Sequence, residues 1–428
     1  MKYSLQEHQL SNGIRVVTIM RPDAATSALT AYLRVGSRFE SKQQRGLSHF
    51  LEHMVFQGTT SYPTARALNI AAEGMGSTLD AATARDYTQY EHHVANERLS
   101  DSCALLAEII SAPNFNGIES ERSIILEEAL DEFSADGRRI DADTLTRRCI
   151  WGNRDLGQPI IGDLESIRRF TQSDLTHFHH RHYVAENLVL GICGPDTHLD
   201  LLNKLKPFEA LRTGRPNIIG SREYKPRTKT AVIVEDERSQ CDSRLVFLTP
   251  GRSAGTAAQY HLLRRALDDG LASRMHERLG NQLGLAYEQW AFWDSFPDVG
   301  AFEFGTVVSP DKVITFFAEI TKLLRELVAN PPQGAELDRL RFRARWSLET
   351  AQDSAAGVLA LHTPAYIYEE PVRTVEARIR RLEQVTSMEL AATARELLSQ
   401  RYVASVVGPV DGIKAHHIHA AVKPQLSP

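Results

Sequence analysis

The stretch LSHFLEHMVFQG, residues 47–58, decides how the whole sequence is interpreted. Its apolar residues follow the period of an ordinary amphipathic helix. The same helix carries His49, Glu52 and His53, each of which needs a partner to offset the cost of leaving water. His49 and His53 project from successive turns onto one face, at the separation that two ligands of one ion require. Since neutral imidazoles are good zinc ligands, the stretch predicts a zinc site.

A catalytic zinc site needs one more protein ligand, and it keeps a position open for water. Glu52 lies beside His53 and can reach the attacking water without occupying a ligand position. The missing ligand is therefore expected elsewhere in the chain, as a carboxylate or a histidine.

The segment ERSIILEEALDE, residues 121–132, is the best source of this third ligand. Glu121, Glu128 and Glu132 lie near one stripe of a helix, at steps of seven and four residues. A carboxylate stripe on a partly apolar helix is, however, more often its solvated face. The spacing alone leaves the choice open.

Composition restricts the class of protein. The chain has 428 residues, 42% of them apolar and 24% charged, and a net charge of −5, which is typical of a soluble globular protein of two or more domains. No basic run stands out, so a nucleic-acid ligand is not expected. The four cysteines are widely scattered, which argues against a thiolate metal site and against a disulfide framework.

Targeting and membrane segments are not expected either. The first residues lack the apolar core of an export signal and the Arg-rich pattern of a transit peptide. No apolar run approaches the roughly 18 residues of a membrane span. The sequence therefore predicts a cytoplasmic protein that does not contact a membrane.

The order of strands and helices occurs twice along the chain. The paired strands expected at 13–20 and 27–36 are matched by strands at 230–236 and 243–251, and the closing strand at 186–194 by one at 401–409. In the second half, leucines at four-residue steps predict one helix over 260–283. The expected fold is α+β, with two homologous α/β-sandwich halves, each a mostly antiparallel sheet packed against helices.

The domain boundaries follow from composition. Residues 209–227 are rich in Pro, Gly and charged residues without a sustained period, which is typical of a linker. We therefore expect a zinc-bearing N-terminal half over 1–208 and a C-terminal half of similar fold over 228–428.

Several motifs together resemble the pitrilysin or mitochondrial-processing-peptidase family of zinc peptidases. HxxEH, in this order, is the inverzincin signature. GIRVV, GLSHFLEHM, LDAATARDYTQY, PIIGDLESI and NLVLGICG follow in the order expected for the family. The resemblance implies one Zn²⁺ per chain, bound by His49, His53 and Glu128, with Glu121 supporting the site. Glu127 is the neighbour that is most easily confused with Glu128.

The resemblance also implies a reaction and a mode of substrate binding. Glu52 would act as the general base in peptide hydrolysis and then pass its proton to the leaving amine. The strand around Asp80 and Ala81 resembles the family's edge strand, which takes an extended peptide by β-augmentation. The family usually has Asn at position 80, and an ionised Asp cannot donate a hydrogen bond there.

A second departure lies in the C-terminal half. Active members resemble SRLxxxLRExxGLAY, with an Arg and a Tyr that help to hold substrate. This chain has SRMHERLGNQLGLAY, so Tyr287 is present and Gly280 occupies the Arg position. The nearby Arg278 is two residues away, which on a helix turns it about 160° off the required face.

The partner is therefore predicted by resemblance. A peptidase dimer is expected, with this chain as the zinc-bearing subunit and a related subunit supplying the Arg that is missing at Gly280. A homodimer that relies on Tyr287 alone is the alternative. A non-hydrolytic scaffold or peptide-binding subunit of the same fold is a third possibility.

Overall fold

A computed structural model describes residues 3–220, 224 and 231–422, and these residues form two compact units. The first unit contains Met1–Leu130, Arg154–Ile219 and Leu348–Arg373. The second contains Asp131–Asn153, Gly220–Ser347 and Thr374–Pro428. Each unit thus includes a segment from the other half of the chain. The predicted domain bounds of 1–208, 209–227 and 228–428 stay a prediction. Residues 221–223 and 225–227 of the expected linker lie outside the described residues.

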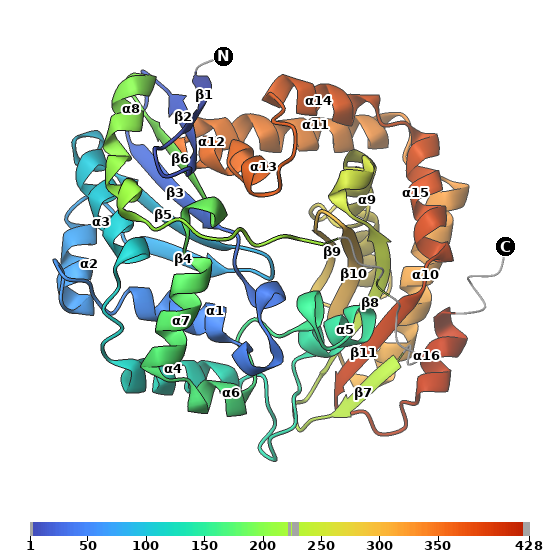
Figure 1. Ribbon diagram of the computed structural model, residues 1–428. Helices are drawn as coiled ribbons and strands as arrows, with labels where there is room; N and C mark the ends of the chain where they lie inside the picture. The colour runs from blue at the N-terminus through green and yellow to red at the C-terminus, as the bar shows by residue number, and fades with distance from the viewer. Residues whose placement is uncertain (1–2, 221–223, 225–230, 423–428) are drawn as a thin grey trace. The chain divides into compact units, whose positions relative to one another are not determined.

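The first unit is built on a six-stranded sheet (Figure 1). In sheet order its strands are β1 (Ser4–Gln9), β2 (Arg15–Met20), β6 (Leu188–Gly194), β3 (Ser27–Leu33), β5 (Thr88–Val94) and β4 (Leu79–Thr83). Strands β2 and β6 pair in parallel, and all other neighbours pair antiparallel. Strand β4 forms one edge of the sheet.

Most helices of the first unit cover one face of this sheet and share its main core. They are α1 (Leu47–Val55), α2 (Ala65–Glu73), α3 (Leu99–Ser111), α4 (Ile118–Leu130), α6 (Leu164–Arg169), α7 (Gln172–His182) and α8 (His198–Lys204). The other face packs against α12 (Ala355–His362) and α13 (Pro364–Ile367), which come from the distant segment. Gly191 in β6 permits this packing, because a Cβ there would lie 2.4 Å from Thr363 Oγ1.

The second unit repeats this design with five strands. In sheet order they are β7 (Ala231–Glu235), β11 (Tyr402–Gly408), β8 (Cys241–Pro250), β10 (Val299–Val308) and β9 (Gln289–Ser295). Strands β7 and β11 are parallel, as β2 and β6 are in the first unit. The order β2-β6-β3-β5-β4 is thus repeated as β7-β11-β8-β10-β9. The predicted α+β class and internal duplication are confirmed.

The helices of the second unit also lie on both faces of their sheet (Figure 1). They are α9 (Ala257–Leu267), α10 (Val313–Ala329), α11 (Ala335–Thr350), α14 (Val375–Gln384), α15 (Ser387–Ser399) and α16 (Ala415–Val422). Helix α5 (Ala142–Trp151) comes from the first half of the chain and contacts β8 and β11. It is the counterpart of α12 in the first unit.

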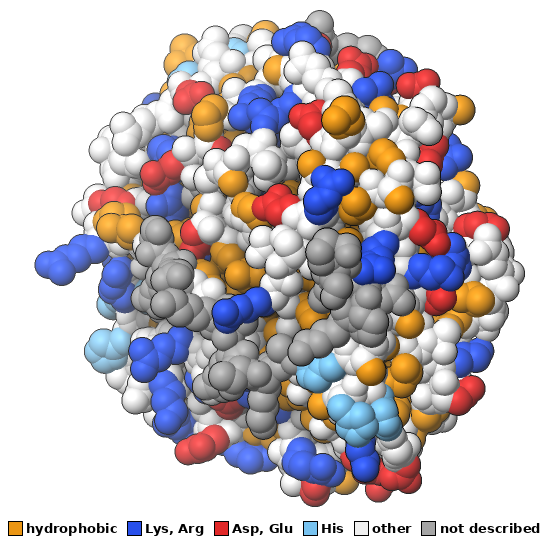
Figure 2. Space-filling model, turned by 90° about the vertical axis from the view of Figure 1, so that its right-hand side faces the viewer, with side chains coloured by type: hydrophobic (Ala, Val, Ile, Leu, Met, Phe, Trp, Pro, Cys, Tyr) orange, Lys and Arg blue, Asp and Glu red, His pale blue; other side chains and the backbone are white. Residues whose placement is uncertain are grey.

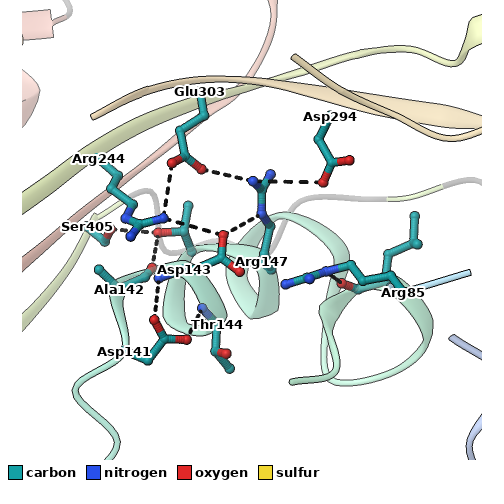
Figure 3. Close-up of polar contacts among 12 residues, drawn as sticks. Arg85, Asp141, Ala142, Asp143, Thr144, Arg147, Arg244, Asp294, Glu303 and Ser405 are labelled. Atoms are coloured by element: carbon teal, nitrogen blue, oxygen red, sulfur yellow. Dashed lines mark hydrogen bonds and ion pairs between the residues drawn. The ribbon is translucent and has the colours of Figure 1, made fainter. Parts of the chain in front are cut away.

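Buried ion pairs hold α5 on the second sheet (Figure 3). Arg147 donates to Asp143 and to Glu303 at 3.0 Å each, and Arg244 donates to the other oxygen of Glu303 at 3.1 Å. Burial opposes the charge of Arg147, but these carboxylates outweigh it and raise its pKa. The hydroxyl of Thr146 lies 2.6 Å from that of Ser405 on β11. Breaking such a buried ion pair is costly, because an uncompensated charge remains.

The single helix expected over 260–283 is wrong. Helix α9 ends at Leu267, and a separate π-helix spans His276–Gln282. Asp268 leaves the helical conformation at φ −145° and ψ 89°, and its side chain accepts a hydrogen bond from the Ala291 backbone. Gly270 then adopts φ +89°, a left-handed conformation that glycine reaches without strain. The four-residue spacing was misleading because Leu271, which continues it across the break, is exposed and belongs to neither helix.

The surface shows no large field of one charge on the face drawn in Figure 2. Lys and Arg side chains are interspersed there with Asp, Glu and hydrophobic side chains. Among the described residues, no helix is long and apolar enough to cross a membrane.

Candidate metal centre

Helix α1 carries the two histidines and is anchored at its N-terminus. Its first residue follows Gly46, whose φ is +89° and where a Cβ would lie 2.4 Å from the Ile161 carbonyl oxygen. The buried Glu40 carboxylate accepts the backbone N–H groups of Gly46 at 2.8 Å and Ser48 at 2.7 Å, which satisfies donors that a helix start leaves unpaired. Burial raises the pKa of Glu40 to about 7, although these amides oppose the shift.

His49, His53 and Glu128 come together in the first unit. One ligand atom from each lies within 4.8 Å of the others. His49 Nε2 is 3.5 Å from Glu128 Oε1, and His53 Nε2 is 3.6 Å from Glu128 Oε2. Zinc bonds of roughly 2.0–2.2 Å place tetrahedral ligands about 3.3–3.6 Å apart, so the three groups fit this ion. Helix α4 supplies Glu128 and packs against α1 (Figure 1).

The pKa of His49 and the hydrogen bond of His53 also suit a metal. Burial, and then the neighbouring His53, lower the pKa of His49 to about 4, so its ring is neutral near pH 7. His53 Nδ1 lies 3.2 Å from Glu121 Oε2, which leaves Nε2 directed at Glu128. Gln57 donates to the other oxygen of Glu121 at 2.6 Å. Such outer partners fix the tautomer and orientation of a ligating histidine.

Glu52 lies next to this group without joining it. Burial raises its pKa, whereas a hydrogen bond from Thr83 and the charge of His53 lower it. The hydroxyl of Thr83, at the end of β4, donates to Glu52 Oε2. In the described part of the chain, no other side chain hydrogen-bonds this carboxylate.

Glu132 of the predicted stripe and the neighbouring Glu127 lie apart from the cluster. Glu127 is exposed on α4. Helix α4 spans Ile118–Leu130, so Glu132 lies beyond its end and in the second unit. The Glu132 carboxylate pairs instead with Arg139. Of the three open choices, Glu128 is therefore the one that meets both histidines.

The predicted substrate strand is β4, at the edge of the first sheet. Asp80 is exposed there and stands directly opposite Glu91 of β5. Ala81 is half-buried, and its side chain packs towards the main core on the α1 side. The substrate-binding roles of both residues stay predictions.

Gly280 and Tyr287 lie in the second unit. Gly280 is in the π-helix, and Tyr287 is fully exposed in the segment that precedes β9. Arg278 is already paired, with Glu319 at 3.0 Å and Glu326 at 2.8 Å. The role of Tyr287 in substrate binding stays a prediction.

Sequence reasoning missed Glu40, Gln57 and Thr83. All three contact the site across long stretches of sequence or through a turn, and none belongs to a spacing motif. Only Thr83 left a signal, because strand alternation puts it on the same face of β4 as Ala81.

Comparisons with known proteins agree with this geometry. Residues 15–163 match the sequence model described as insulinase (peptidase family M16), and residues 169–343 match the one described as the peptidase M16 inactive domain. A relative described as an uncharacterized zinc protease of Mycobacterium tuberculosis is 30% identical over 94% of this chain and 92% of its own. Another of the same description, from Bacillus subtilis, is 23% identical over 95% of this chain and 98% of its own.

Two crystal structures share the fold. A protease from Helicobacter pylori has a TM-score of 0.87 at 19% identity, covering 96% of this chain and 100% of its own. A peptidase M16 inactive domain from Pseudomonas fluorescens has a TM-score of 0.86 at 18% identity, covering 95% and 98%. With the HxxEH helix, the duplicated sheets and these matches along its length, the chain belongs to peptidase family M16, the pitrilysin-like zinc proteases.

Proposed function

We propose that the protein is a zinc-dependent endopeptidase that hydrolyses flexible or unfolded peptides. The observation that carries the proposal is the convergence of His49, His53 and Glu128 within 4.8 Å of one another, beside the buried Glu52. An exposed acidic group alone would carry little weight. Here two of the three groups are imidazoles that are mostly buried, and one of them has a carboxylate partner on its second nitrogen.

The residues divide the chemistry among themselves. His49, His53 and Glu128 would hold one zinc ion, which supplies carbonyl polarisation and a lower pKa for the attacking water. Glu52 accepts the proton of that water on its carboxylate and later donates it to the nitrogen of the leaving amine. Glu121 keeps the proton of His53 on Nδ1, so that Nε2 remains free to coordinate.

The substrate would bind as an added strand along β4. An edge strand offers unpaired backbone groups, and backbone pairing gives affinity without much selection of side chains. This mode requires a peptide that can extend, which favours unfolded segments over compact proteins.

The test separates the base from the metal. The Glu52→Gln variant should keep one zinc per chain but lose hydrolysis of an unstructured fluorogenic peptide by about 10²–10⁴-fold. Glu127→Gln removes a neighbouring exposed carboxylate and should behave like the wild type. Wild-type turnover by Glu52→Gln would overturn the role of Glu52, and a zinc-loaded wild type that is inactive with every candidate partner would favour a peptide-binding scaffold.

We further propose that the active form is a dimer that encloses the substrate, with this chain as the zinc-bearing subunit. The support is that Gly280 occupies the position where the family has an Arg. The nearby Arg278 is already paired with Glu319 and Glu326. Activity that appears only after a related subunit is added supports the pair. Full activity of the purified chain supports the homodimer instead. The cytoplasmic location stays a prediction.

A further inference from the structure

Thr83 joins two parts of the proposed site. It is the last residue of β4, and its hydroxyl donates to Glu52 on α1. Leu79 and Ala81, four and two residues before it, pack on the main core, so alternation turns Thr83 to the α1 side of the sheet. Helix α1 and strand β4 are in contact along this side.

The hydrogen bond has a definite consequence for the carboxylate. The hydroxyl of Thr83 donates to Oε2 of Glu52, and the backbone of Thr83 also hydrogen-bonds this carboxylate, so one residue holds it at two points. A carboxylate side chain otherwise rotates between several orientations. A hydrogen bond that fixes one of them raises the fraction of time in which the carboxylate is placed for proton transfer. A hydrogen bond to an ionised group is also stronger than a hydrogen bond between two neutral groups.

We propose that Thr83 is a positioning residue that aligns Glu52, so that the strand that binds the substrate also orients the base. This inference rests on the proposed function, because only a peptide docked on β4 would share that strand with the base. A peptide paired along β4 would restrain Thr83 and, through it, Glu52. Docking in the correct register and alignment of the base would then be one event.

The first experiment compares three variants by steady-state kinetics on an unstructured peptide. Thr83→Val keeps the shape but removes the hydroxyl, and we expect kcat to fall by about 10- to 100-fold with KM changed less than threefold, by the usual size of a hydrogen bond to a charged group. Thr83→Ser restores the donor and should recover most of kcat. Thr78→Val, the same change at an exposed position just before β4, should match the wild type. Zinc content should be the same in all of them.

The second experiment needs no activity. In zinc-free protein, a cycle of Thr83→Val and Glu52→Ala is followed by the midpoint of urea unfolding. We expect Thr83→Val to shift the midpoint clearly when Glu52 is present and about half as much or less when it is absent.

The outcomes distinguish this inference from the proposed function. Additive shifts in the cycle, or an unchanged kcat in Thr83→Val, overturn the role of Thr83 while leaving peptide hydrolysis intact. A coupled cycle in a protein that hydrolyses no peptide overturns the proposed function and shows that the contact only stabilises the fold. Loss of kcat in Thr83→Val without recovery in Thr83→Ser also overturns the positioning role, since the hydroxyl would then not be what matters.

Discussion

The two units place very different residues beside equivalent edge strands. In the first, α1 contacts β4 and presents two imidazoles to a carboxylate on α4. In the second, α9 contacts β9 and presents Arg265, which pairs with Asp269 at 2.7 Å and donates to Ser347 at 2.7 Å. Arg343 of α11 binds the same Asp269 at 2.7 Å.

The difference shows where function lies in a duplicated fold. Two imidazoles and a carboxylate converge in the first unit, whereas in the second unit two arginines pair with the carboxylate of Asp269. Strand order, helix order and parallel pairing are the same in both. The chemistry therefore depends on a few side chains placed on the shared scaffold.

The largest expected effect is at Glu128, the proposed third zinc ligand. Glu128→Gln should lower zinc affinity by about 10³-fold or more, since loss of one outer partner alone costs about 10–100-fold. Competition against a chelator measures it. Glu127→Gln, one residue away and exposed, is the control and should keep wild-type affinity. Equal affinities of the two variants would erase the contrast between the units.

The second unit should respond in stability and not in metal binding. Arg147→Met removes one cation from the buried group around Glu303 and should lower the free energy of unfolding by about 3–4 kcal/mol. Arg138→Met breaks an exposed pair with Asp136 and should cost under about 0.5 kcal/mol. Urea unfolding gives both values. A large change in zinc affinity in Arg147→Met would contradict the division of roles.

Acid should affect the metal-free protein through His49. Its pKa is about 4 when folded and 6.5 when unfolded, so the unfolded chain binds more protons between these values. Stability is therefore complete above pH 6.5 and is lost as pH falls towards 4, by about 3 kcal/mol from this residue. His261 of α9, with a pKa lowered by burial to about 4, should add a similar loss.

The response to zinc should distinguish His49 from His261. A saturating ion should stabilise the folded protein near pH 7 and steepen the loss in acid, because protons compete for His49. The His49→Asn variant should show neither effect of zinc, while His261→Asn should show both. Unfolding free energies with and without zinc across this pH range test it, and identical zinc responses would refute the distinction.

The smallest effect is expected at Gly280. A Cβ there would lie 3.7 Å from the His276 ring, an ordinary contact, so a side chain can be added without local movement. Gly280→Arg should raise kcat/KM of the chain alone by about tenfold if an absent Arg is what a partner supplies. Gly280→Ala is the control for the backbone. No gain in Gly280→Arg would favour a homodimer that relies on Tyr287.

Local spacing made part of the site predictable. His49 and His53 lie four residues apart on one helix, so their common face follows from the helix period alone. Two helical turns relate Glu121 to Glu128, but their pairing with α1 depends on packing, and only the family resemblance selected them. Glu40 and Thr83 were not predicted, because their contacts arise when separate elements fold together.

The fold was predictable to a similar depth. Alternating strands and repeated element order gave the class and the duplication, since both are properties of local pattern. The break after Leu267 was missed because the apolar spacing continues past Asp268, although the backbone leaves the helical conformation there. The positions of α5 and α12, each of which covers the sheet of the other half of the chain, were also missed. No local sequence pattern indicates which sheet a helix covers.

The exchange of α5 and α12 between the two halves limits where the chain can be divided. One face of each sheet is covered by a helix from the opposite half of the chain, α12 on the first sheet and α5 on the second. A fragment that stops after residue 208 would leave Tyr32 and Val189 facing solvent, because α12 would be missing. Separately synthesised halves should therefore aggregate unless they are mixed, because each half carries a helix that the sheet of the other half needs.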